Sequence, residues 1–402
     1  MSYSKKYFLI ADIDAFFASV EENRRNLHGK PLAVGGPSLR RGVVSSANYI
    51  ARKYGVKAAM PIEEALKLCP QMIVVKPDFE TYVKYSRAFS KIVERFFPRQ
   101  IKLSIDEVLI PQNITKYFPL EELPELIYSM KKTVEGELGL NVTVGGGPNP
   151  ELAKMATNIS KPDGLKLLPV EEKKLIKEIE GIPIRDFPGI GRKSALILEG
   201  AGMKTIKDLL SNRDTLALLL GGKRASELIA SLRGVNTFSS WSAKPQKSIG
   251  REITFAKNIS PLDKDSLEAA LFQVCFLVAT KAAAEEMKGK TVALKVKFSD
   301  FTVKTWVETL PIPAYSPIFL KNLLMKHLVK LRKPIRLIGI YLKDLVPITL
   351  VEEFLPGFDK TLKAFRKEEK FLRKIPKNSA MLKPAMETKL GKIGQGDRNS
   401  KK

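Results

Sequence analysis

Two groups of acidic residues, far apart in the chain, have the types and the spacing that a metal site needs. Asp12 ends the apolar segment YFLIADI and Asp14 follows two residues later, whereas Asp106 and Glu107 stand side by side within IKLSIDEVLI. An unpaired charge in such an apolar run is very costly, so a cation shared by the two groups would explain both. The alternative is that the first pair starts a helix and the second pair lies in a solvated turn, and spacing alone leaves both interpretations open.

Carboxylates around an open site suit a pair of Mg²⁺ ions about 4 Å apart, which clamp the attacking and leaving oxygens in phosphoryl transfer. Mg²⁺ takes few protein carboxylates, so substrate phosphates would complete its ligands. Tyr49 and Arg52 are three residues apart and share a helix face. Arginine can bind phosphate with two hydrogen bonds, and Lys161, beside a Pro-Asp-Gly turn, offers another charge. Taken singly, a residue of this kind is more often a solvated surface cation than a functional residue.

Composition restricts the partners and the kind of metal. The chain has 402 residues, 44% hydrophobic and 28% charged, which predicts two to four globular domains. Lys and Arg outnumber Asp and Glu by 68 to 43, a net charge of +25 that favours nucleic acid, with an anionic membrane surface as the rival partner. The sequence contains no uninterrupted apolar run of about 18 residues, and we expect no signal peptide. The cysteines and histidines are too few for a zinc site, so any metal is a hard, oxygen-bound ion; Cys69 and Cys275 are predicted to be buried thiols in a reducing compartment.

The elements that must position these residues alternate between strands and helices in the first 169 residues. Asn149 is predicted to cap a helix that starts at Pro150, with Glu151 in its first turn. Another helix is predicted to start near Ser46, after a strand within 41–55. The remaining predicted elements are strands at 7–13, 30–36, 101–110 and 141–147 and helices at 16–26 and about 80–98.

Residues 170–236 have a short-range helical pattern with two glycine turns. FPGIGRKSALIL is typical of a helix–hairpin–helix unit, and LLGGKRASELIA is a weaker second copy. The backbone N–H groups of Gly189 and Gly191 at a helix start can bind a phosphate without reading sequence, and Arg192 and Lys193 add charge. The alternative is an ordinary helix-packing unit.

Residues 237–246 have the composition of a linker, and residues 247–346 follow the order β-α-β-β-α-β. Alternation in this region predicts one apolar sheet face and one face with a basic side. Its cations are candidate contacts for DNA phosphates, which would make binding depend steeply on salt. They are Lys247, Arg251, Lys295, Lys297 and Lys304. The basic tail, 347–402, is expected to be disordered at its end.

With these motifs in view, the chain resembles the Y-family translesion DNA polymerases of the DNA polymerase IV (DinB) type. The segments that carry the resemblance run in family order and cover about residues 5–346: ADIDAFFASVEE, GKPLAVGG, RGVVSSANYIARKYGVKAAMPIEEA, KLSIDEVLI, NVTVGGGPNPELAKMATNISKPDG, FPGIGRKSA and KSIGREITF. The resemblance implies an α+β right-hand polymerase. Its parts would be a ferredoxin-like palm with small fingers (1–169, fingers about 22–80), a helix–hairpin–helix thumb (170–236) and a β-α-β-β-α-β little finger (247–346).

The resemblance also assigns residues. It implies that Asp12, Asp106 and Glu107 are catalytic and bind two Mg²⁺ ions, for which Mn²⁺ is a possible substitute, together with the carbonyl of Ile13. One ion would activate the primer 3′-OH, the other would hold the incoming triphosphate, and pyrophosphate would leave. Asp14 is expected to cap a helix or support the site. The nucleotide contacts implied are Phe17 as the steric gate against a ribose 2′-OH, Phe16 beside it under the sugar, Tyr49, Arg52 and Lys161 on the triphosphate, and Ser46 as a weaker candidate.

Further expectations rest on the same resemblance: low fidelity, tolerance of damaged templates, primer–template DNA and dNTPs as partners, no membrane, a monomer, and a prokaryotic cytoplasm in association with the nucleoid. A sliding-clamp partner is expected, but its segment is not located, because the nearest candidate, LVEEFLPGF at 350–358, lacks the usual Gln. The sequence departs from the family pattern at Val108-Leu109-Ile110-Pro111, Ile50 and Pro150. These departures bear on rate and fidelity.

Two other functions use parts of the same pattern. A nucleotidyl cyclase would share the acids but leaves the hairpins and the basic C-terminal domain unexplained. A DNA-binding scaffold with a degenerate palm would require the loss of a metal ligand, whereas all three acids are present.

Overall fold

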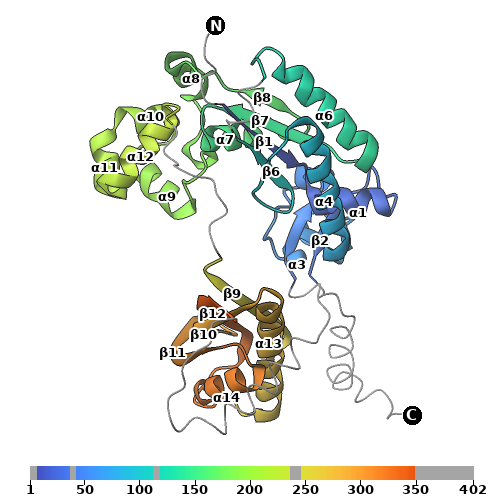
Figure 1. The fold of residues 1–402 in the computed structure, drawn as a ribbon, viewed down its shortest axis with the longest axis vertical. Coiled ribbons are helices and arrows are strands. Elements are labelled where there is room, and N and C mark those ends of the chain that lie inside the picture. The colour runs from blue at the N-terminus through green and yellow to red at the C-terminus, as the bar shows by residue number, and fades with distance from the viewer. Residues whose placement is uncertain (1–6, 37–41, 112–117, 236–245, 349–402) are drawn as a thin grey trace. The chain divides into compact units, whose positions relative to one another are not determined.

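The computed structural model describes residues 7–36, 42–111, 118–235 and 246–348. The chain divides into two compact units, residues 1–243 and 244–402, and each is described by itself. Figure 1 labels most of the elements of each unit. The predicted linker, except residue 246, and the tail from residue 349, including the candidate clamp segment, lie outside the described residues.

The first unit is built on a five-stranded sheet with the strand order β5-β6-β1-β7-β8. Its strands are β1 (Phe8–Ile13), β5 (Ile101–Lys102), β6 (Glu107–Ile110), β7 (Val142–Gly147) and β8 (Leu165–Leu167). The central strand β1 pairs antiparallel with both β6 and β7. The predicted strands at 7–13 and 141–147 are therefore confirmed. The predicted strand at 101–110 is two short antiparallel strands joined by a turn.

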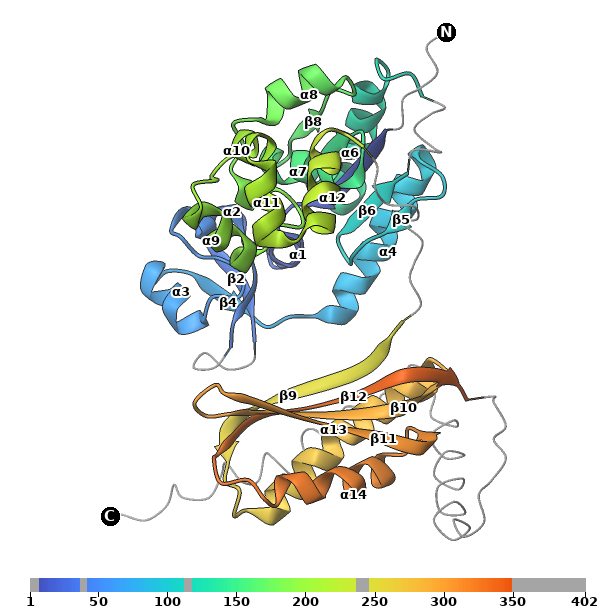
Figure 2. The same cartoon turned by 90° about the vertical axis from the view of Figure 1, so that its left-hand side faces the viewer.

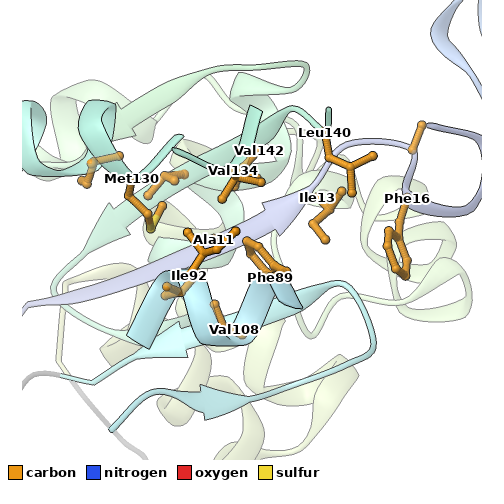
Figure 3. Packing of buried hydrophobic residues seen from close by; sticks show 14 of the residues in the cluster. Ala11, Ile13, Phe16, Phe89, Ile92, Val108, Met130, Val134, Leu140 and Val142 are labelled. Atoms are coloured by element: carbon orange, nitrogen blue, oxygen red, sulfur yellow. The ribbon is translucent and has the colours of Figure 1, made fainter. Parts of the chain in front are cut away.

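Both faces of β1 are buried, which is why its sequence is almost wholly apolar. One face packs against helices α4 (Phe79–Phe96) and α6 (Leu123–Leu138), as the close view in Figure 3 shows for Ala11 and Ile13. On the other face, Phe8 and Ile10 pack with Ala153 of helix α7 (Pro150–Ser160). This alternation decides that Asp12, two residues after Ile10, lies on the α7 side of the sheet.

Helix α7 begins as the sequence predicts. The Asn149 side chain accepts a hydrogen bond from the Leu152 N–H at 2.8 Å, and Pro150 is the first helical residue. The helix lies directly on β7, because a Cβ atom on Gly145 would be 2.1 Å from the Thr157 nitrogen. Only glycine allows so close a contact between a strand and a helix backbone.

A smaller three-stranded sheet, with the order β3-β2-β4, is formed by the part of the chain between β1 and α4. Its elements are α1 (Phe16–Arg24), β2 (Leu32–Gly35), β3 (Val44–Ala47), α2 (Tyr49–Lys53), α3 (Ile62–Leu68) and β4 (Ile73–Val75). The predicted helix start near Ser46 is wrong. Ser46 pairs with Val34 in the sheet, and α2 starts at Tyr49, because the Asn48 side chain caps it by accepting from the Ala51 N–H at 3.0 Å.

Short helices with a shared core follow, as the sequence predicts for residues 170–236. They are α8 (Glu172–Ile179), a 3₁₀ turn (Ile184–Asp186), α9 (Arg192–Gly200), α10 (Ile206–Ser211), α11 (Arg213–Leu220) and α12 (Gly222–Leu232). Gly189 in the first hairpin has a φ of 98° and Gly221 in the second has a φ of 86°, a backbone region that favours glycine. The two hairpins are joined, since the Arg224 guanidinium donates to the Gly189 carbonyl at 3.0 Å.

The second unit has the predicted β-α-β-β-α-β order. Its elements are β9 (Ser248–Ile259), α13 (Lys264–Ala284), β10 (Met287–Phe298), β11 (Val303–Ala314), α14 (Pro317–Leu328) and β12 (Ile335–Pro347). The strand order is β11-β10-β12-β9, and Figure 2 shows both helices on the same face of the sheet. Val292, Leu294 and Val296 pack in the core with the helices, so Lys295 and Lys297 belong to the open face. The predicted division into an apolar and a partly basic face is confirmed.

In the part of the chain that the structure describes, α13 alone is long and apolar enough to cross a membrane, judged by length and composition. Glu268 and Lys281 interrupt its apolar residues, so the sequence contains no continuous apolar run from which such a helix would be predicted. Its residues Leu271, Val274 and Val278 are buried in the core against the sheet. Both cysteines are free and buried, as predicted.

The close contact between β7 and α7 predicts the effect of a single methyl group. Replacement Gly145→Ala places a Cβ atom against the backbone of Thr157 and Ala153, so it is expected to destabilise the first unit by about 3 kcal/mol. Gly136→Ala in α6 is the matched control: no atom lies within 4 Å of the added carbon, and the change is expected to stabilise by up to about 1 kcal/mol. Urea unfolding followed by circular dichroism measures both, and equal stability of the two variants would contradict the close contact.

Candidate active site

The sheet brings the predicted acids together. Asp12 and Glu107 are directly opposite each other in the β1–β6 pair, and the Ile13 N–H donates to the Asp106 carbonyl at 3.0 Å. Asp12 and Glu107 share the α7 side of the sheet, because opposite residues in an antiparallel pair point the same way. Asp106 ends the turn before β6 and accepts a hydrogen bond from the Ser104 hydroxyl. Asp106 and Glu107 can thus stand side by side in an apolar segment because Asp106 ends a turn and Glu107 begins the following strand.

Two lysines of the α7 region pair with these carboxylates. The Lys154 Nζ is 2.7 Å from the Asp12 Oδ2 and 3.0 Å from the Glu107 Oε1. The Lys161 ammonium donates to the other oxygen of Asp12. Lys161 was predicted as a site residue, whereas sequence reasoning missed Lys154. The available signal was its spacing, since residues seven apart lie on the same side of a helix.

The three carboxylates differ in exposure. Only 5% of the Asp12 surface is exposed, whereas Asp106 and Glu107 are partly buried. Burial raises the pKa of Glu107, while the neighbouring charge of Lys154 opposes this rise. Asp12 and Glu107 depend on positive charge in such surroundings, and the ammonium groups of Lys154 and Lys161 supply it here.

The donor set fits a hard divalent cation. Asp12, Asp106 and Glu107 offer only oxygen atoms, at the ends of neighbouring strands, and the Ile13 carbonyl follows at the same strand end. The Glu107 Oε1 is buried and has no hydrogen-bond partner beside its ion pair with Lys154. Among the described residues, no three acidic, histidine or cysteine side chains are arranged to hold a metal ion as they stand, and Lys154 pairs with two of these acids.

Asp14 supports the site from behind. Its buried carboxylate accepts hydrogen bonds from the Thr143 hydroxyl at 2.9 and 3.0 Å, from the Asp163 N–H at 2.7 Å and from the Tyr49 hydroxyl at 3.3 Å. Burial raises the pKa of Asp14. The expectation that Asp14 could cap a helix is wrong, because α1 follows Ala15 without any side-chain cap. Asp14 instead ties β7, the turn after α7 and helix α2 to the end of β1.

An aromatic group lies at the start of α1. The Phe17 ring stacks on Tyr82 with centroids 4.3 Å apart and meets Phe79 edge-on at 5.8 Å. The Tyr82 hydroxyl donates to the buried Glu21 carboxylate at 2.8 Å, which fixes the ring behind Phe17. Tyr82 and Phe79 were not predicted from the sequence. Phe16, expected under the sugar, is only 3% exposed and packs in the main core.

The two predicted triphosphate contacts on α2, Tyr49 and Arg52, lie against each other. The Arg52 guanidinium carbon is 4.7 Å from the centre of the Tyr49 ring, and its Nε donates to the Ala47 carbonyl at 2.9 Å. Burial, with the nearby charge of Asp14, raises the pKa of Tyr49 to about 12. The Ser46 hydroxyl donates to the Ala15 carbonyl at 3.2 Å, so it supports the turn before α1.

A cavity of about 940 Å³ lies between α7 and the first hairpin. The predicted hairpin contacts all line it, and so does Lys154, the lysine that reaches Asp12. Its lining residues are Lys154, Asn158, Ile159, Arg185, Asp186, Phe187, Pro188, Gly189, Ile190, Gly191, Arg192, Lys193, Ser194 and Arg224. The cavity is strongly basic and has the chemistry of a phosphate-binding surface.

The five cations predicted to contact DNA in the second unit do not share one face. Lys295, which pairs with Glu252 at 2.6 Å, and Lys297 lie on the open face. Lys304 is opposite Val296, and Arg251 is opposite Ile340, so both project to the helix side from edge strands. Lys247, just before β9, is exposed. Contact of these residues with DNA stays a prediction.

The chain is similar to known proteins along most of its length. Residues 11–158 match the model of the impB/mucB/samB family, and residues 246–352 match the model of its C-terminal domain. A DNA polymerase IV of Clostridium perfringens (strain SM101 / Type A) is 35% identical over 355 residues, covering 85% of this chain and 95% of that protein. A DNA polymerase IV of Listeria monocytogenes serotype 4a (strain HCC23) is 33% identical over 354 residues, covering 87% and 97%.

Solved structures give the same result. A Y-family DNA polymerase chimera of Dbh and Dpo4 has a TM-score of 0.73 at 27% identity, covering 85% of this chain and 99% of its own. An insertion ternary complex of Dbh DNA polymerase has a TM-score of 0.56 at 25% identity and the same coverage. DinB from Sulfolobus solfataricus has a TM-score of 0.54 at 27% identity, covering 84% and 98%.

The supporting role of Asp14 can be tested through Thr143. Replacement Thr143→Val removes the hydroxyl that donates to the buried Asp14 carboxylate, so it is expected to cost about 1–3 kcal/mol of stability. Thr143→Ser keeps the hydroxyl and is expected to lose less than half as much. Thermal and urea unfolding measure both effects, and a valine variant as stable as the original chain would contradict the network.

Proposed function

The chain belongs to the Y-family DNA polymerases of the DNA polymerase IV type, and we propose that Asp12, Asp106 and Glu107 form its metal-binding catalytic centre. The enzyme is a DNA-directed DNA polymerase that carries out low-fidelity translesion synthesis. The observation that carries the proposal is the position of Asp12 directly opposite Glu107 in adjacent strands, with Asp106 in the turn beside them. Three carboxylates that repel one another are held at one strand end by the sheet itself.

Y-family polymerases are metal-dependent, and we infer that this chain uses two Mg²⁺ ions, with Mn²⁺ as a substitute. Bound there, the ions would lower the pKa of the primer 3′-OH and neutralise charge on the transferred phosphoryl group. Asp12, Asp106, Glu107 and the Ile13 carbonyl supply the ligands. Because the primer 3′-OH and the incoming nucleotide would be held next to each other, their reaction would be a step within one complex and not a bimolecular encounter.

The residues around the carboxylates bind and orient the nucleotide. Arg52 and Tyr49 on α2 and Lys161 after α7 meet the triphosphate, with Asp14 fixing the positions of Tyr49 and of the turn beside Lys161. The half-buried Phe17 ring, backed by Tyr82, closes the space that a ribose 2′-OH would need. Phe16 contributes chiefly by packing, and Ser46 by holding the turn before α1.

Primer–template DNA and dNTPs are the substrates. The hairpin amides of Gly189 and Gly191, with Arg192 and Lys193, bind the sugar–phosphate backbone in the cavity beside α7. Lys295 and Lys297 on the open face of the second unit add phosphate contacts, with Lys247, Arg251 and Lys304 at its edges. These contacts carry no sequence information, which suits an enzyme that copies any template.

Further parts of the assignment follow from the family alone. We infer a monomeric enzyme of the prokaryotic cytoplasm that acts at the nucleoid in DNA replication and repair and binds a sliding clamp through its C-terminal region. The competing functions account for less. A cyclase has no use for the two hairpins and the basic open face, and a scaffold has no need of three intact acids.

A primer-extension assay separates these functions. Purified protein with Mg²⁺, dNTPs and a primer–template is expected to extend the primer, and Asp106→Ala is expected to reduce extension at least about a hundredfold while DNA binding is kept. Ser104→Ala, which removes only the hydrogen bond to Asp106, serves as the matched control and is expected to keep most of the activity. Extension by Asp106→Ala at the original rate, or product formed from free nucleotide alone, would contradict the assignment.

The Phe17 ring predicts sugar selectivity. Replacement Phe17→Ala opens the space beside Tyr82, so ribonucleotide incorporation relative to dNTP is expected to rise about tenfold or more. Phe79→Ala is the control, because its ring contacts both Phe17 and Tyr82 edge-on but is not among the predicted nucleotide contacts. Single-nucleotide kinetics with dNTP and rNTP measure the ratio. An unchanged ratio in Phe17→Ala would refute the steric role.

A further inference from the structure

Lys154 faces two different environments at once. Its ammonium is 2.7 Å from the Asp12 Oδ2 and 3.0 Å from the Glu107 Oε1, and 26% of the side chain is exposed. The exposed part lines the basic cavity that leads to Gly189 and Gly191 of the first hairpin. Lys154 therefore lies on the boundary between the carboxylates and the surface that suits phosphate.

The ammonium and a divalent ion compete for the same oxygens. Ion pairs place the Lys154 ammonium on one oxygen of each of Asp12 and Glu107, and Lys161 takes the second oxygen of Asp12. A cation coordinated by these oxygens would lie within a few ångströms of the Lys154 ammonium, where like charges repel strongly at low effective dielectric. An ion can bind Asp12 and Glu107 together only after this ammonium has left.

The backbone of helix α7 is held in place, so only the Lys154 side chain can move its ammonium away from the carboxylates. Helix α7 is fixed at its start by Asn149 and against β7 by the contact at Gly145. A lysine has a flexible four-carbon stem, so its ammonium can turn toward the cavity while the helix stays in place. In the cavity it would meet Arg192 and Lys193, and this position is unfavourable until a negatively charged phosphate is there.

From these contacts we propose that Lys154 couples metal binding to DNA binding. In the protein without DNA it neutralises Asp12 and Glu107; when a DNA backbone phosphate occupies the hairpin cavity, the ammonium moves to that phosphate and leaves the carboxylates to the divalent ion. The inference rests on the proposed function, and it makes Lys154 a positioning residue. Thermodynamic linkage requires that DNA tighten metal binding by the same factor by which metal tightens DNA binding.

The test measures Mn²⁺ affinity directly, by electron paramagnetic resonance of the free ion, with and without primer–template DNA. Lys154→Met removes the competing charge at nearly constant volume, so Mn²⁺ is expected to bind the DNA-free variant about tenfold more tightly than the original chain. DNA is expected to tighten Mn²⁺ binding several-fold in the original chain and much less in the variant. Lys154→Arg keeps the charge and is expected to keep the coupling.

Lys193→Met is the matched control, because Lys193 lines the same cavity without touching a carboxylate. It is expected to weaken DNA binding and leave DNA-free Mn²⁺ affinity unchanged. Lys154→Gln is expected to behave as Lys154→Met does and replaces it if the methionine variant does not fold. Unchanged or weaker Mn²⁺ binding in both neutral variants would overturn the inference alone, because a lysine that merely holds the acids in place predicts that result. Failure of the original chain to bind Mn²⁺, even with DNA and dNTP, would overturn the metal site and the inference with it.

Discussion

Mutual repulsion among Asp12, Asp106 and Glu107 is the constraint on which the rest of the structure depends. Strand pairing between β1 and β6 holds these acids at one strand end, where the buried Asp12 and the partly buried Glu107 would be costly without positive charge. The structure meets this demand with Lys154 of helix α7 and Lys161 directly after it. Catalysis by divalent ions requires that metal ions supply this positive charge instead. The site is therefore suited to exchange lysine ammonium groups for divalent ions.

The surrounding elements serve to hold this edge in place. Glycine in β7 lets helix α7 lie against the sheet, which brings Lys154 within reach of the strand ends. Asp14 ties three separate segments together through Thr143, Tyr49 and the Asp163 N–H. At the start of α1, Tyr82 stacks on the Phe17 ring and is itself fixed by its hydrogen bond to Glu21. The parts that would touch a nucleotide are thus positioned by buried contacts that do not touch it.

Much of this could be predicted from the sequence, because strand alternation and helix caps are local signals. The apolar β1 strand and the Asn149 cap of α7 gave clear patterns. The start of α2 was misplaced, since Ser46 and Asn48 are both good caps and only pairing with Val34 decides between them. The spacing of seven residues from Lys161 places Lys154 on the same side of the helix, but it does not reveal its partners, and no local signal marks Tyr82. Their roles depend on contacts between residues more than 40 positions apart, and no local pattern records such contacts.

We infer that the three acids share divalent ions when substrates are bound. A crystal of the chain with primer–template DNA, a non-hydrolysable dNTP and Mn²⁺ provides the decisive test, through anomalous scattering at the manganese edge. Anomalous peaks are expected about 2.1–2.2 Å from carboxylate oxygens of Asp12, Asp106 and Glu107, with the Lys154 ammonium turned away from them. Ordered DNA and nucleotide with no peak between these acids, and Lys154 still bonded to Asp12 and Glu107, would contradict it.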